Sequence, residues 1–425
     1  MDVPVWQRLI SLAGLLAMVA IAWVFSKHRA RVPWRLVAWG IGLQLTFGVL
    51  IMKTGVGRWF FSLLNDGVLA LLGFTATGTE FIFGDFASEK FTIALNVLPT
   101  LIFFSALTTM LYHLGWMQGL VRGFAWIMRR TMKTSGSETL ATAANTFVGQ
   151  TEAPLMVAPF IGAMTMSELM AVMTGGFATV AGGVLAAYVG LLEGVVPDIA
   201  GHLIAASVMS APAALVIAKV MWPETEASET SGETEIQVEQ PDANLVDAAA
   251  RGATEGMKLA LNVGAMLIAF IALIALANAL LGLPFSVYNE WMGLDGATAV
   301  EPLTFQGILG WVFWPFAFLI GVPASECAVV GALLGEKLVL TEFIAYLHFY
   351  ETLSEGAQQL SPRTVVIASY ALCGFANFGS IGIQLGGIGG IAPERRHDLA
   401  RIGVRAMFGG MLASLMTASV AGLLY

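Results

Sequence analysis

Two pairs of adjacent threonine and glutamate residues interrupt otherwise apolar stretches of the sequence, and these pairs end in Glu152 and Glu342. Each pair is followed by the tripeptide Gly-Phe-Ala, at 176–178 and at 374–376. A carboxylate at the centre of a bilayer costs about 2.5–3.5 kcal/mol on insertion scales, so an acid there needs a compensating partner or a function. Two acids in matching contexts predict one binding site made from two related segments.

The first pair belongs to a polar segment, Gln150, Thr151 and Glu152, which presents an amide, a hydroxyl and a carboxylate in a row. Gly149 permits a turn and Pro154 suits the start of a returning helix. We interpret the segment as a helix broken within the bilayer, where unwound backbone must be buried in protein or line a cavity. This set suits a neutral ligand with several donors and acceptors. In the alternative interpretation, these side chains only satisfy one another between helices.

The downstream stretch 174–183 contains too many glycines for a stable uninterrupted helix, because each interior glycine costs about 1 kcal/mol relative to alanine. We expect either a discontinuous helix or close packing of small residues between helices. The side-chain oxygens of Asn145 and Thr179 favour an ion site in this region.

The second half brings Glu326, Glu336 and Glu342 into one apolar region. Glu342 has the strongest claim to a site because it repeats the Thr-Glu context, whereas we expect Glu336 to pair with Lys337 or to lie at the membrane interface.

An amide and a hydroxyl follow the second Thr-Glu pair at Asn377 and Ser380, three residues apart and on one face if the stretch is helical. Phe375, just before them, is interpreted either as a wall of a pocket or as part of the core.

The composition is that of a polytopic integral membrane protein, with 57% apolar residues, 12% charged residues and a mean hydropathy of +0.77. Apolar runs near the ~20 residues that cross a ~30 Å hydrocarbon core recur. We expect membrane spans at about 8–25, 34–53, 92–112, 199–222, 257–283 and 399–424.

Basic residues follow the first apolar run, which has no evident cleavage site, so the run is interpreted as a retained helix. By the positive-inside rule the first loop is cytoplasmic and the N-terminus lies outside. Three basic groups are present, at Lys27, Arg29, Arg31 and Arg35, at Arg129, Arg130 and Lys133, and at Arg395, Arg396, Arg401 and Arg405. By contrast, 223–246 carries seven acids and no base, which predicts a flexible, solvated loop.

Enzyme motifs are missing from the sequence: it has no His-Glu-x-x-His zinc motif, and Gly335, Glu336 and Lys337 do not make a phosphate-binding loop. We therefore expect no enzyme activity. Repeated broken helices point instead to a secondary transporter for a small polar ligand. An ion channel or ion-translocating subunit is the alternative, because buried carboxylates alone suffice for it.

Several motifs, in order along nearly the whole chain, resemble the concentrative nucleoside transporter family in its shorter bacterial form. They are Gly-Gln-Thr-Glu-Ala-Pro-Leu at 149–155, Ser-Glu-Leu at 167–169, Met-Thr-Gly-Gly at 173–176, Thr-Glu-Phe at 341–343 and Cys-Gly-Phe-Ala-Asn at 373–377, with 81–84 and 103–107 earlier. The resemblance implies an all-α polytopic fold of about eight transmembrane helices plus two re-entrant hairpins in an inverted repeat.

The same resemblance implies a homotrimer in the inner membrane, in contact with lipid and without a nucleic-acid partner, in which a mobile transport domain carries nucleoside past a scaffold. The expected parts are mainly scaffold helices (1–135), a first hairpin and broken helix (136–198), a transmembrane helix (199–222), the acidic loop (223–246), a long scaffold helix and its connection (247–302), a second hairpin and broken helix (303–390) and a C-terminal span (391–425). Both hairpin segments belong to the expected transport domain.

By resemblance, specific roles follow. The nucleobase is expected to bind Gln150, Thr151 and Glu152 beside Phe375, the ribose to bind Glu342, Asn377 and Ser380, and Na⁺ to bind the side chains of Asn145 and Thr179 with the carbonyls of Val148 and Val180. Thr341 stands where the family usually has Asn, and Gly183 and Gly379 where hydroxyl residues are frequent. Coupling to H⁺ is therefore the alternative to Na⁺, with Glu152 or Glu342 as the proton carrier.

Overall fold

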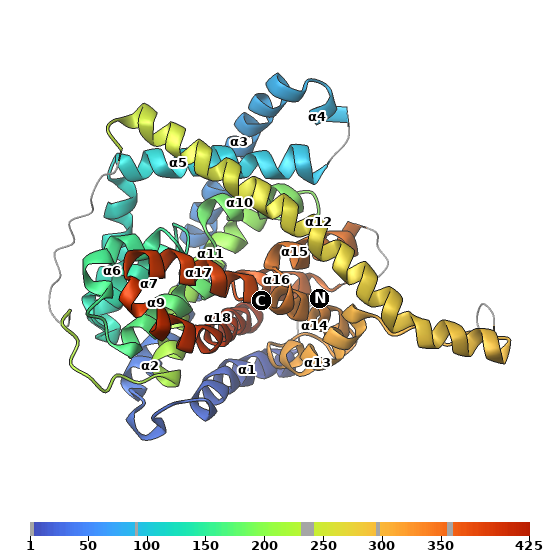
Figure 1. Cartoon of the computed structure of the whole chain (residues 1–425). Coiled ribbons are helices and arrows are strands. Elements are labelled where there is room, and N and C mark those ends of the chain that lie inside the picture. Colours follow the sequence, from blue (N-terminus) through green and yellow to red (C-terminus); the bar gives the residue numbers. More distant parts are fainter. Residues whose placement is uncertain (1–3, 90–91, 231–241, 295–297, 355–359) are drawn as a thin grey trace.

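The structure is a computed structural model that describes residues 4–89, 92–230, 242–294, 298–354 and 360–425 (Figure 1). All regular secondary structure in these residues is helical, and eight described stretches are long and apolar enough to cross a membrane. They are α1 (Val5–Val24), α2 (Trp34–Lys53), α3 (Gly55–Phe83), η2 with α5 (Ile93–Val97 and Leu98–His113), α9 with α10 (Met166–Ala178 and Gly182–Leu192), α11 (Ile199–Met221), α12 (Leu245–Met292) and η5 with α18 (Pro393–Arg395 and Arg396–Leu424). The expected all-α polytopic membrane fold is confirmed.

All six spans expected from hydropathy are present, and α3 is a further span that was not among them. Arg58, Asp66 and Glu80 lie along this helix and divide its apolar residues, so no uninterrupted apolar run marks it. The helix is nevertheless a continuous 29 residues long. The short elements η1 (Arg29–Arg31) and α4 (Phe86–Glu89) lie in connections.

The same order of elements occurs twice in the chain. An amphipathic or apolar helix is followed by a hairpin of short helices, by two half-helices separated by irregular backbone, and by a long span. In the first copy these are α6 (Trp116–Met132), α7 (Gly136–Asn145) with η3 (Ala153–Val157) and α8 (Ala158–Ile161), then α9, α10 and α11. In the second they are α13 (Phe305–Leu319), α14 (Cys327–Val339) with α15 (Glu342–Ser354), then α16 (Pro362–Leu372), α17 (Phe378–Ile391) and α18. Hydropathy divides such segments poorly because the helices are short and end inside the protein.

Two capping boxes determine where the first hairpin and the following half-helix begin. The Ser135 backbone N–H donates to the Glu138 carboxylate at the start of α7, and the Thr165 N–H donates to Glu168 at the start of α9, both at 2.9 Å. The shared pattern Ser/Thr-x-x-Glu satisfies backbone donors that the first helical turn leaves unpaired.

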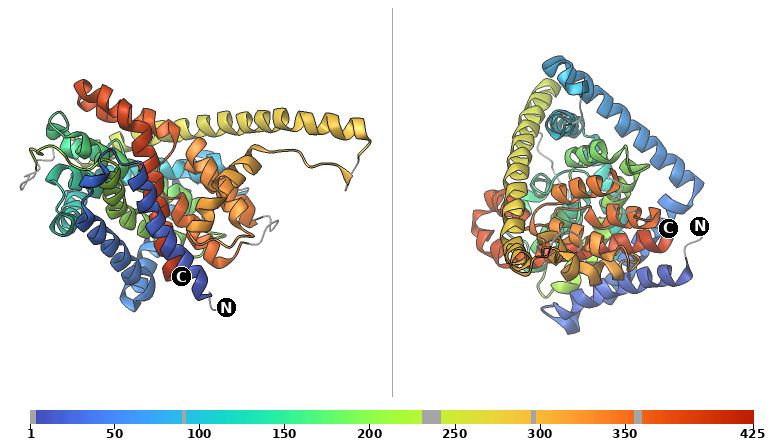
Figure 2. Two further views of the ribbon diagram at one scale, coloured as in Figure 1. Left: turned by 90° about the horizontal axis from the view of Figure 1, so that it is seen from below. Right: turned by 90° about the vertical axis from the view of Figure 1, so that its right-hand side faces the viewer.

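The helices form a buried bundle and an outer layer. Helices α9, α10, α11 and α18 are almost entirely buried, and α1 and α2 pack on α18 and α11. Helix α12 packs along α5 and, with α3, flanks the bundle, while most side chains of α3 and α12 are not covered (Figure 2). The half-helices α9, α10 and α16 therefore lie at the centre, whereas only one side of α17 is buried.

The three basic groups of the sequence collect at one end of the molecule. The Lys27 backbone N–H donates to the carbonyl of Met221, at the end of α11, at 2.9 Å, and the Arg405 guanidinium lies 5.4 Å from the ring centroid of the next residue, Trp222. The Gly136 N–H, three residues after Lys133, donates to the Thr230 carbonyl at 2.8 Å, in the segment that follows α11. The N- and C-terminal ends of the chain lie together (Figure 2). The Arg8 side chain of α1 donates to the carbonyl of Tyr425, the last residue, at 3.2 Å.

Candidate functional site

Glu342 lies at the centre of a buried polar cluster formed by three elements. One of its carboxylate oxygens accepts a hydrogen bond from the Tyr188 hydroxyl of α10 at 2.8 Å, and the other accepts one from the Asn377 amide at 2.7 Å. All three side chains are buried. Glu342 is also the first residue of α15, where the helix dipole favours a negative charge. The carboxylate is therefore held in place by donors from both repeats.

Asn377 connects this carboxylate to the first hairpin. Its side-chain oxygen caps α17 by accepting from the Ser380 N–H at 2.8 Å. The Ser380 hydroxyl accepts from the Gln150 amide at 3.3 Å, and the Gln150 oxygen accepts from Gln384 at 3.0 Å. We call the hydrogen-bonded series Tyr188, Glu342, Asn377, Ser380, Gln150 and Gln384 the polar chain.

The other three residues that the sequence assigned to substrate lie beside the polar chain without a hydrogen bond to it in the structure. Thr151 packs on α17, where a Cβ atom added to Gly387 would lie 3.0 Å from its methyl group. Glu152 is exposed, and its carboxylate turns back against Gly149 so closely that a side chain at that glycine would collide with it. Phe375 is half-buried against the core.

The predicted ion-site residues surround two interruptions of helical backbone, after α7 and after α9. The Asn145 amide nitrogen donates to the Ala141 carbonyl at 3.1 Å, while its buried side-chain oxygen has no hydrogen-bond partner among the described residues. The Thr179 hydroxyl donates to the Gly175 carbonyl at 2.9 Å, which leaves its oxygen lone pairs available.

The two interruptions adjoin one another, because a Cβ atom added to Gly182 would lie 3.2 Å from the Phe147 carbonyl oxygen. Val148 and Val180 are both buried there. The structure thus gathers backbone and side-chain oxygens at the C-terminal ends of two helices, where the helix dipoles favour a cation.

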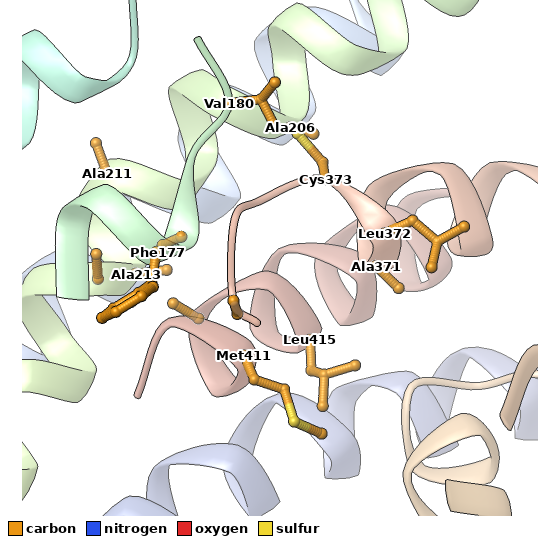
Figure 3. Close-up of a cluster of buried hydrophobic side chains, with 14 of the residues drawn as sticks. Phe177, Val180, Ala206, Ala211, Ala213, Ala371, Leu372, Cys373, Met411 and Leu415 are labelled. Atoms are coloured by element: carbon orange, nitrogen blue, oxygen red, sulfur yellow. The ribbon is translucent and has the colours of Figure 1, made fainter. Parts of the chain in front are cut away.

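The interruptions of the two repeats also meet. Gly374 has a φ of +126°, and a Cβ atom there would lie 2.9 Å from the carbonyl oxygens of both Phe177 and Ala178. In Figure 3, Cys373 lies beside Val180, which follows α9, and the Cys373 carbonyl accepts from the Ser414 hydroxyl at 2.8 Å. The repeated Gly-Phe-Ala tripeptide therefore marks a contact between the two halves.

The ion pair expected between Glu336 and Lys337 is not present in the structure, because each side chain has other partners. The Lys337 ammonium donates to the carbonyls of Ala371 and Cys373 at 2.9 and 3.4 Å, at the C-terminal end of α16. Adjacent residues of a helix point in different directions. The Glu336 carboxylate therefore lies elsewhere, with one oxygen 2.8 Å from the Nδ1 atom of His348 on α15.

Tyr188 and Gln384 belong to the polar chain but were not predicted from the sequence. Gln384 lies one turn beyond Ser380, so the polar spacing 377, 380 and 384 on one helical face was an available signal. Tyr188 is a single tyrosine in an apolar helix, and residue type alone does not distinguish it from a core residue.

The start of the acidic segment 223–246 is packed against the first hairpin, which differs from the expected solvated loop. The Ser228 hydroxyl donates to Glu168 of α9 at 2.6 Å, and the Thr230 and Ser137 hydroxyls, the second of them in the hairpin, lie 2.7 Å apart. Thr230 is buried. Residues 231–241 lie outside the described part of the chain.

Three protein-family models together match most of the chain. The model described as the Na⁺ dependent nucleoside transporter C-terminus matches residues 202–422, and the corresponding N-terminus model matches 13–86. A gate model described as nucleoside recognition matches 94–194.

Curated relatives align over the whole chain. Sodium/nucleoside cotransporter 1 of Mus musculus is 43% identical over 431 residues, which cover 99% of this chain and 64% of the relative. Solute carrier family 28 member 3 of Eptatretus stoutii is 42% identical, and 61% of its length is covered. The chain thus spans less than two thirds of these animal proteins. The uncharacterized transporter YutK of Bacillus subtilis is 44% identical, with 97% of this chain and 98% of YutK covered.

Solved structures agree with the fold. CNTnw in an inward-facing, substrate-bound state superposes with a TM-score of 0.89 at 42% identity, covering 98% of both chains. A CNTnw variant in an outward-facing state gives a TM-score of 0.90 at 42% identity, covering 99% of this chain and 98% of that one. The chain therefore belongs to the Na⁺-dependent, concentrative nucleoside transporter family.

Proposed function

We propose that the protein is a secondary active transporter that imports nucleosides together with a cation, Na⁺, across the bacterial inner membrane. The observation that carries this proposal is the polar chain, which joins Gln150 of the first hairpin to Glu342 of the second within the buried bundle. A nucleoside has hydroxyl donors at one end and a base with donors and acceptors at the other, and the chain offers matching groups to both.

The ribose hydroxyls donate to Glu342 in this proposal. A carboxylate has about four lone-pair sites, and Tyr188 and Asn377 use one on each oxygen, so the two oxygens retain acceptor capacity for a ligand. Asn377 and Ser380 complete the ribose contacts.

The nucleobase binds the first hairpin. The Gln150 amide exchanges its partner Ser380 for the base edge, and the Glu152 carboxylate and the Thr151 hydroxyl add an acceptor and a donor. The half-buried Phe375 ring supplies an apolar wall. Aromatic rings stack on every type of nucleobase, because each base has a π-face.

The coupling Na⁺ binds the Asn145 and Thr179 side-chain oxygens and the Val148 and Val180 carbonyls. Support comes from the buried Asn145 oxygen without a partner and from the two helix C-terminal ends that face this region. Unwound carbonyls and half-helix ends are the usual cation ligands in transporters built from repeats. The site adjoins Gln150, which packs on Gly176 of α9, so ion and substrate order the same hairpin.

Transport follows alternating access, in which the loaded transport domain moves past a scaffold as an elevator. We assign the hairpin segments 136–198 and 303–390 to the transport domain, and α3, α5 and α12 to the scaffold, because these three helices form the outer layer. The exposed faces of α3 and α12 contact lipid and, in a homotrimer, neighbouring subunits. Within 1–135, α1 and α2 pack on α18 and α11 instead.

Coupling supplies the direction of transport. One monovalent cation that enters at 100 mV releases about 2.3 kcal/mol, and a tenfold gradient adds about 1.4 kcal/mol. Together these support roughly 500-fold accumulation at one-to-one stoichiometry.

Uptake of radiolabelled uridine into proteoliposomes tests this function, with an inward Na⁺ gradient, an inward proton gradient or neither. We expect saturable accumulation with the Na⁺ gradient alone. Accumulation with the proton gradient alone would assign coupling to Glu152 or Glu342, and flux without saturation would indicate a channel. No uptake of uridine or any other nucleoside by folded protein would refute nucleoside transport.

A further inference from the structure

A cavity of about 680 Å³ lies between the end of α1, the end of α11 and the first turns of α18, and its lining includes no residue of the polar chain. Its lining includes the cations Lys27, Arg401 and Arg405 and the aromatic residue Trp222, and it contains no acidic residue. We call it the Trp222 cavity.

Two cations are held over one buried ring in this cavity. Trp222 is only 5% exposed, the Lys27 ammonium lies 4.0 Å from its ring centroid and the Arg405 guanidinium lies 5.4 Å from it. The ring face attracts each cation, but the two cations repel each other. Within the described residues, no carboxylate lies within 4 Å of the charged groups of Lys27, Arg401 or Arg405. In the part of the chain that the structure describes, these cations therefore form no ion pair.

The walls of the Trp222 cavity are held by specific contacts between elements. The Lys27 backbone N–H donates to the Met221 carbonyl at 2.9 Å, which fixes the first loop on the end of α11. The Phe25 and Phe408 rings meet edge to face at 5.4 Å, which joins α1 to α18. These contacts fix the backbone that carries the cations, while the exposed Lys27 side chain and the half-buried Arg405 side chain are placed by the Trp222 ring.

The cavity lies at the boundary of the membrane. Lys27 follows the apolar run of α1 by three residues, and Trp222 directly follows α11. Tryptophan favours the membrane–water interface, and the basic first loop assigns this end to the cytoplasm. Basic pockets between transmembrane helices at that surface bind anionic headgroups.

We propose that the Trp222 cavity binds a phosphate group, with the phosphate oxygens between Lys27, Arg401 and Arg405. The phosphate belongs either to the headgroup of an anionic lipid of the cytoplasmic leaflet or to a free anion. Arginine and lysine both bind phosphate, and the phosphate group supplies a counter-charge.

Native mass spectrometry of the full-length protein in a neutral detergent tests the proposal, with phosphatidylglycerol, phosphatidylcholine or inorganic phosphate as the probe. We expect selective retention of phosphatidylglycerol. The double variant Lys27→Gln/Arg405→Gln should bind it roughly 25-fold more weakly, at about fivefold per cation removed. The swap Lys27→Arg/Arg405→Lys retains both charges and should retain binding.

Arg31→Gln is the matched control, because Arg31 is an exposed cation of the same loop outside the cavity lining. It should bind phosphatidylglycerol as the wild type does. Equal losses in the control and the double variant, or full binding by the double variant, would overturn the proposal. Cavity-dependent binding of inorganic phosphate without phosphatidylglycerol would support the phosphate site and reject the lipid as its source. Uridine binding by each variant verifies the fold.

Discussion

At the scale of single residues, the site depends on how one buried carboxylate is satisfied. Glu342 has two neutral donors, Tyr188 and Asn377, and no cation within 4 Å among the described residues. Neutral donors hold a carboxylate without neutralising it, so it stays a strong acceptor for ligand hydroxyls.

Glu342→Gln should lower the efficiency of uridine uptake about 10- to 150-fold, because hydrogen bonds to a charged group contribute about 1.5–3 kcal/mol. The measurement is the ratio of maximal uptake rate to KM in proteoliposomes. Glu351→Gln, a half-exposed acid of the same helix, is the control and should leave this ratio unchanged. Wild-type uptake by Glu342→Gln would contradict the assignment.

Tyr188→Phe should raise the KM for uridine about fivefold, since it removes one donor, worth about 1 kcal/mol, that positions Glu342. Tyr346→Phe is the matched control, because its ring lies 4.4 Å from the Tyr188 ring but its hydroxyl donates to the Ser369 carbonyl. Equal KM values for the two variants would show that Tyr188 acts only through packing.

The sequence predicted part of this residue-scale arrangement. Four of the seven predicted substrate residues, Gln150, Glu342, Asn377 and Ser380, lie in one hydrogen-bonded chain, and their role in binding stays a prediction. The partners of Lys337 were not predictable, because they are backbone carbonyls from a segment more than 30 residues away.

At the scale of elements, the two helix interruptions and their contact determine the site. The glycine content of 174–183 correctly indicated a discontinuous helix, now seen between α9 and α10. The interruption between α16 and α17 packs against the one between α9 and α10. This contact was not predictable from sequence, because it depends on where Gly374 lies in three dimensions.

Gly374→Ala should destabilise the protein by about 1–3 kcal/mol, because φ is positive there and the added methyl group would meet two carbonyl oxygens. Thermal unfolding in detergent measures the effect. Gly386→Ala, on α17 with open space around its Cα, should be neutral or slightly stabilising. Equal unfolding midpoints for the two variants would show that the interruption tolerates a side chain.

At the scale of the whole molecule, the packing collects the three basic groups at one end, which the loop charges alone left undecided. The placement of the basic groups follows from two backbone hydrogen bonds, one from the first loop to the end of α11 and one from the start of α7 to Thr230. Hydropathy marks only 257–283 of α12, which is 48 residues long, because its polar ends continue the helix beyond the apolar run.

The orientation predicts sided labelling of two introduced cysteines. Arg31 and Arg58 are exposed, and they flank the single span α2. In intact cells, Arg58→Cys should react with an impermeant maleimide, and Arg31→Cys should react only after permeabilisation. Both native cysteines are buried, so background labelling should be low. The reverse pattern would invert the topology.

Equilibrium binding of radiolabelled uridine in Na⁺ and in choline buffer tests the central claim most directly. Because coupling between two ligands is reciprocal, Na⁺ should lower the Kd for uridine in the wild-type protein, and uridine should lower the Kd for Na⁺ by the same factor. Asn145→Ala should require more Na⁺ for the same uridine affinity, whereas Asn262→Ala, exposed on α12, should behave as wild type. A uridine Kd that is identical in Na⁺ and choline would contradict Na⁺ coupling at this site, and no saturable uridine binding in either buffer would contradict the account as a whole.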